Sequence, residues 1–77
     1  MNFRKPPPIV KDDAGRIKMR SPNERERVLA IATRIVAGQV AKGEVDDNDP
    51  EALRAVSKEA VETAVAAYRA AEEYLCG

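Results

Sequence analysis

Two patterns of polar residues in this chain could carry chemistry, and the first is an acidic run, EVDDND, at residues 44–49. Clustered carboxylates suit calcium, and a helix–loop–helix calcium site needs a glycine at its sixth position and a glutamate at its twelfth. Counted from Asp46, these positions hold Glu51 and Ser57. The run therefore predicts a solvated helix cap and turn, without a metal site.

The second pattern is the alternating sequence RIKMR, which begins at Arg16. In an extended strand, Arg16, Lys18 and Arg20 would lie on one side, and the apolar Ile17 and Met19 on the other. Arginine is the commonest specific reader of guanine in the major groove of DNA. The three basic residues are therefore candidate nucleic-acid contacts.

Other chemistry finds little support in the composition. The chain has no histidine, the commonest general base and metal ligand, and its one cysteine, Cys76, cannot form an internal disulfide. We therefore expect no catalytic residue, no cofactor and no metal, and we expect that the protein is not an enzyme. No apolar run approaches the about 20 residues that span a bilayer, and no signal peptide is visible, so we expect a cytoplasmic protein with no membrane partner.

The charge of the chain is unevenly distributed, although its formal net charge is zero. Residues 1–20 hold six basic and two acidic groups, whereas residues 44–77 hold three basic and nine acidic groups. A basic front half is thus joined to an acidic back half.

The longest element that could position these groups is a helix predicted for residues 50–75. This stretch is rich in Ala, Glu, Arg, Lys and Leu and has no internal Pro or Gly. Asp49 suits the N-cap and Pro50 the first helical position. A stripe with the four- and three-residue spacing of a coiled-coil seam runs along it. The stripe consists of Leu53, Ser57, Ala60, Ala64, Ala67, Ala71 and Tyr74.

A second helix is predicted for residues 22–42. Ser21 and Glu24 form a capping box with Pro22 at the first helical position, and Gly43 is a natural stop. Because the connection is short, the helices should be antiparallel neighbours, with facing residues whose numbers sum to about 93. The expected ion pairs are Lys58–Glu62 and Arg69–Glu73 within a helix, and Glu72 and Glu73 with Arg20 and Arg25 across the hairpin.

The sequence therefore predicts an all-α fold, an antiparallel two-helix hairpin with an extended N-terminal arm. The expected segments are a basic, proline-containing arm at 1–20, which could form a short β-hairpin, and a helical hairpin at 21–77 with helices at 22–42 and 50–75 and a loop at 43–49. A hairpin of about 55 residues buries too little apolar surface to be stable alone. We expect a homodimer that forms a four-helix bundle, or a helical protein partner.

This architecture favours a small, non-enzymatic helical module for oligomerisation or protein interaction. The predicted interface with a second copy or a partner consists of Val28, Ile31, Ile35, Val56, Val61, Val65 and Tyr68. In the predicted register Tyr74 lies beside Met19.

DNA binding is the alternative function. The order of strand, capped helix, loop and helix from Arg16 to Leu75 resembles the ribbon-helix-helix family of bacterial repressors and antitoxins. The resemblance implies that two chains pair their strands, and that Arg16, Lys18 and Arg20 enter the major groove. Three features depart from that family, because the predicted helices are longer, the acidic loop would repel a DNA phosphate, and the alternation is only five residues long.

Overall fold

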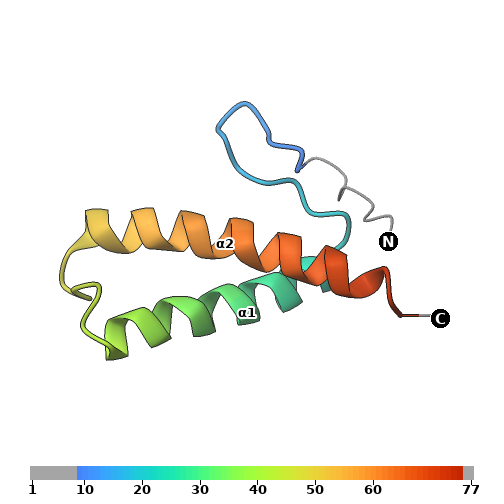
Figure 1. The fold of residues 1–77 in the computed structure, drawn as a ribbon. Helices are drawn as coiled ribbons and strands as arrows, with labels where there is room; N and C mark the ends of the chain where they lie inside the picture. The colour runs from blue at the N-terminus through green and yellow to red at the C-terminus, as the bar shows by residue number, and fades with distance from the viewer. Residues whose placement is uncertain (1–8, 76–77) are drawn as a thin grey trace, which may run out of the picture.

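The computed structural model describes residues 9–75, which form two antiparallel helices with the preceding chain folded back beside them (Figure 1). Helix α1 spans Pro22–Ala41 and α2 spans Pro50–Glu72. The predicted all-helical hairpin is confirmed, whereas the dimeric bundle stays a prediction. The start of the predicted arm, with its three consecutive prolines, and Cys76 lie outside the described residues.

The first turn of α1 uses its capping residues differently from the prediction. The Ser21 hydroxyl accepts a hydrogen bond from the Glu24 N–H at 3.1 Å, as expected for an N-cap. The Glu24 carboxylate, however, accepts from the N–H of Arg20 at 2.9 Å, one residue before the cap. Only half of the capping box therefore forms, and the Glu24 side chain is directed toward the arm.

The loop between the helices begins and ends at the residues that the sequence predicts, Gly43 and Asp49. Gly43 has a φ of 76°, and the Glu44 N–H reaches back to the carbonyl of Gln39 at 3.0 Å, which closes α1 in a Schellman motif. The Asp49 side chain then accepts from the N–H groups of Glu51 and Ala52, which opens α2. Both helix ends at the loop thus have capping hydrogen bonds.

The end of α2 differs from the prediction. The helix stops at Glu72, and the N–H groups of Tyr74 and Leu75 bond to carbonyls three residues earlier, so the chain tightens into a turn. Tyr74 is 84% exposed. The predicted contact between Tyr74 and Met19 is therefore wrong, because the tightened turn leaves the tyrosine in solvent.

The core of the hairpin is small. It consists of Val28, Ala32, Ala60, Ala64 and Val65. Val28 and Val65 have numbers that sum to 93, as the predicted register requires. Ala67 and Ala71 of the predicted seam are exposed, whereas the arm residues Ile9, Ile17 and Met19 pack against this core.

The arm turns back on itself beside α2 (Figure 1). Gly15, with a φ of 77°, closes a turn in which the Asp12 carboxylate accepts from the N–H groups of Ala14 and Arg16. A single antiparallel bridge joins Lys11 and Ile17, and no regular strand forms within residues 9–75. The arm is thus a minimal hairpin that uses the helices as its floor.

Candidate interaction surface

An apolar groove, named here the seam groove, follows the line where α1 and α2 meet. It consists of two adjoining hollows of about 370 and 350 Å³, which share Leu29, Ser57 and Val61. Its apolar lining consists of Ile17, Met19, Val28, Leu29, Ala32, Val36, Ala37 and Val61. Leu29 is 42% exposed there, so a large apolar side chain meets solvent beside the core.

Four basic side chains, named here the basic rim, border the larger hollow. They are Arg16 from the arm, Arg25 from α1, and Arg54 and Lys58 from α2. All four are exposed, and none forms an ion pair with another residue of the described part of the chain. The seam groove therefore combines an apolar floor with an unneutralised positive edge.

The acidic residue at this edge is already paired. The Glu62 carboxylate accepts from the Lys11 ammonium group at 3.1 Å, which ties the arm to α2. The predicted pair between Lys58 and Glu62 is therefore not the one that forms. Because Glu62 bonds to Lys11, Lys58 stays available to a ligand.

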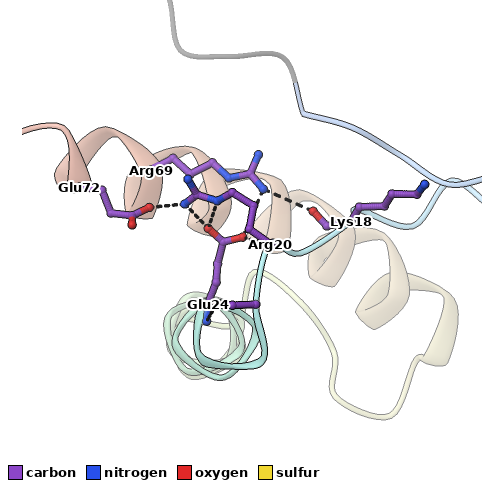
Figure 2. A network of polar contacts seen from close by, with 6 residues as sticks. Lys18, Arg20, Glu24, Arg69 and Glu72 are labelled. Carbon is purple, nitrogen blue, oxygen red and sulfur yellow. Dashed lines mark hydrogen bonds and ion pairs between the residues drawn. The ribbon is translucent and has the colours of Figure 1, made fainter.

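A second cluster of charges fastens the arm to both helices (Figure 2). The Glu24 carboxylate accepts from the Arg20 Nε at 2.7 Å and from the Arg69 Nη2 at 3.3 Å. Arg20 also donates to Glu72, and Arg69 donates to the Lys18 carbonyl at 3.3 Å. Residues from the arm, α1 and α2 thus share one carboxylate.

The electrostatics of this cluster follow from its hydrogen bonds. Glu24 is 2% exposed, and the hydrogen bond from Arg20 lowers the pKa of its carboxyl from 4.5 to about 2, although burial opposes that shift. The same hydrogen bond raises the pKa of Arg20 further above its ordinary value. Glu24 and Arg20 are therefore both ionised at neutral pH.

Sequence patterns identified this cluster only in part. The pairing of Arg20 with Glu72 was predicted from the register, and it forms. The predicted pairing of Arg69 with Glu73 does not form, because Arg69 bonds to Glu24 across the hairpin. The numbers of residues 24 and 69 sum to 93, so the predicted register places them opposite each other. The capping box, however, predicts that the Glu24 side chain bonds within the first turn of its own helix.

The predicted interface residues fall into two groups. Val28 and Val65 are 2% and 0% exposed, so both side chains are buried inside the hairpin itself, and their contact with a partner stays a prediction. Ile31, Ile35, Val56, Val61 and Tyr68 are half-buried. Val61 lines the seam groove, whereas Ile31 and Tyr68 line a smaller hollow of about 240 Å³ with Arg27 and Arg34.

The predicted nucleic-acid contacts are also divided. Ile17 and Met19 are half-buried while Arg16 and Lys18 are exposed, so the predicted alternation is confirmed. Arg20 is bonded to two carboxylates, Glu24 and Glu72, and so its guanidinium is not free to read a base. Of the three candidates, Arg16 and Lys18 keep unpaired side chains within the described residues.

Two further properties concern residues 9–75 as a whole. In this range there is no group of three or more His, Cys, Asp or Glu side chains that could hold a metal ion. Neither helix combines the length and the apolar character needed to cross a membrane. No protein-family model matches the chain, and no curated protein or solved structure gives a significant match to it.

Proposed function

We propose that this chain is a small, non-enzymatic interaction module that binds a helix in the seam groove, either from a second copy or from a helical partner. The observation that carries the proposal is the apolar lining between α1 and α2, in which Leu29 is left 42% exposed. Exposed apolar grooves with a polar edge are typical of sites for amphipathic helices.

The size of the core supports the same proposal. Five apolar residues are buried in the described chain, and three of them are alanine. Because a chain of this size buries little apolar surface, an added helix would contribute stability that the hairpin alone lacks. A helix laid on Leu29, Val36 and Val61 would extend the hairpin toward a bundle.

Chemical-shift mapping by NMR tests the proposal. A neutral amphipathic peptide of about five helical turns, with leucine at i, i+3, i+4 and i+7, should shift the signals of Leu29, Val36 and Val61. The variant Leu29→Glu should weaken this binding by at least about tenfold, as truncation or charging of a central apolar contact does. Ala66→Glu, on an exposed part of α2, is the matched control.

The same spectra identify the source of the helix. If the groove signals shift as the protein alone is concentrated, and Leu29→Glu abolishes that shift, a second copy occupies the groove. If neither peptide nor protein concentration moves these signals, the seam groove is not a binding surface and the proposal fails.

DNA binding is the second candidate, favoured by the exposed and alternating Arg16 and Lys18. A labelled duplex should then bind at low salt, with an affinity that falls steeply as salt rises. The variant Arg16→Ala/Lys18→Ala should remove this binding without loss of helix content. A duplex that does not bind at low salt would exclude this candidate.

A further inference from the structure

We infer that the occupant of the seam groove is an amphipathic helix of another protein, with acidic residues flanking its apolar stripe. This inference rests on the proposed function and names the chemistry of its partner. The observation behind it is the basic rim, which brings cationic side chains from three separate elements to one groove.

The cations of the basic rim come from the arm and from both helices that line the larger hollow. Arg54 and Lys58 are four residues apart, so they project from the same face of α2. Arg25 is contributed by α1 and Arg16 by the arm. A helix lying in the groove would place its two flanks against these cations, which are long enough to follow its side chains.

The positive charges of the rim form no ion pair within the described part of the chain. Arg20 and Arg69, which are part of the Glu24 cluster, are bonded to carboxylates or carbonyls. Glu62, the carboxylate among the residues lining the larger hollow, is bonded to Lys11. The acidic flanks of a partner could therefore form ion pairs with rim cations that have no ion-pair partner in the described part of the chain.

A second copy is a poorer occupant. Outside the seam groove, the half-buried Ile31 and Tyr68 lie beside two arginines, so this apolar patch of a second copy has basic flanks. A twofold arrangement of groove on groove would also bring two basic rims together, and like charges across an interface are unfavourable. The occupant is thus expected from another protein.

A nucleic acid is also a poorer occupant. Neither hollow of the seam groove is lined by an aromatic side chain on which a base could stack. The floor is formed by Leu29, Val36, Val61 and their apolar neighbours. A charged phosphate backbone makes no favourable contact with such apolar side chains. An amphipathic helix with acidic flanks can pack its apolar stripe on the floor and pair its carboxylates with the basic rim.

Three peptides of about 18 residues, five turns of helix, test the inference. They share one leucine stripe and differ only in the flanking residues, which are Glu, Gln or Lys. Calorimetric titration of the full chain should show the Glu peptide binding at least about tenfold more tightly than the Lys peptide at low salt. This preference should shrink at high salt, because exposed charges are screened.

Variants assign the preference to the rim. Arg54→Gln/Lys58→Gln should remove most of the preference for the Glu peptide while keeping the binding of the Gln peptide. Arg34→Gln/Lys42→Gln removes the same charge at exposed sites outside the seam groove and should keep the preference. Circular dichroism confirms that both double variants keep their helix content.

The outcomes separate this inference from the proposed function. Equal binding of the three peptides would overturn the acidic partner and keep the groove as a helix site. Loss of the preference in both double variants would also overturn it, because net charge alone would then explain the effect. Binding of a DNA duplex at the rim in place of the Glu peptide would assign these cations to nucleic acid. Failure of every peptide to bind would overturn the proposed function as well.

Discussion

Glu24 in the first turn of α1 and Arg69 near the end of α2 form an ion pair across the hairpin, with 3.3 Å between Oε1 and Nη2. Their side chains are 3% and 10% exposed, so both charges are largely removed from water. Desolvated charges are tolerated only where hydrogen bonds compensate them. Arg20 supplies that compensation and also bonds to Glu72, so the arm cannot leave without exposing the pair.

Replacement of Glu24 should therefore be costly. In Glu24→Gln, Arg69 loses its anionic partner in a nearly buried position, and we expect a loss of roughly 2–3 kcal/mol in the free energy of unfolding. The measurement is urea unfolding followed by circular dichroism. Glu26→Gln, an exposed carboxylate two residues away, is the control and should change the stability by less than about 0.5 kcal/mol. Equal effects of the two variants would contradict the role assigned to the pair.

The same carboxylate should make the stability depend on acid pH. The pKa of Glu24 is lowered in the folded state from 4.5 to about 2, so its contribution is present above about pH 4.5 and is lost as the pH falls toward 2. After allowance for screening by solvent around so small a domain, this contribution is roughly 1–2 kcal/mol.

Thermal unfolding at a series of pH values from about 7 down to about 2 measures this dependence, because the range covers both pKa values of Glu24. The melting temperature of the wild type should fall through the acid range, and that of Glu24→Gln should fall less. A wild type and a Glu24→Gln variant with parallel pH profiles would show that other carboxylates govern acid unfolding.

Most of the helical framework could be predicted because its signals are local. Ser21 and Asp49 cap the helices with their own side chains, and Gly43 adopts the positive φ that ends α1. Each of these residues determines a helix end within a few positions of itself, so the local sequence is enough to predict that end. The register followed from the shortness of the loop between Gly43 and Asp49.

The packing of the arm could not be predicted in the same way. Helical spacing placed Ala67 and Ala71 in the seam, but Ile17 and Met19 cover the helices from a segment far away in sequence. The arm therefore covers a face of the hairpin that helical spacing alone does not identify. The seam groove was missed for the same reason, because its rim joins Arg16 to residues of two helices.

The displaced seam can be tested with two matched alanines of α2. Ala64 is 0% exposed, whereas Ala67 is exposed although the same sequence stripe contains both. Ala64→Leu should overpack the contact with α1 and destabilise the fold by about 1–3 kcal/mol. Ala67→Leu should change the stability by less than about 0.5 kcal/mol. Urea unfolding compares the two variants, and a larger loss in Ala67→Leu would show that the predicted seam, not the observed one, is buried.

Two glycines of the α1 end should respond in opposite directions to the same substitution. Gly43 has a φ of 76°, which a residue with a Cβ adopts at a cost, so Gly43→Ala should destabilise the fold by about 1 kcal/mol. Gly38 lies inside α1, and an added Cβ there would meet no atom within 4 Å. Gly38→Ala should therefore stabilise the fold by about 0.5–1 kcal/mol, because alanine favours the helix.

The comparison of these two variants separates backbone conformation from packing, since neither added methyl group meets a neighbour. Thermal unfolding of both proteins under the same conditions is the measurement. A loss of stability in Gly38→Ala would mean that another chain packs against this turn of α1, because only a close contact could make a helical Cβ unfavourable there. Concentration dependence of that loss would then identify the contacting chain as a second copy.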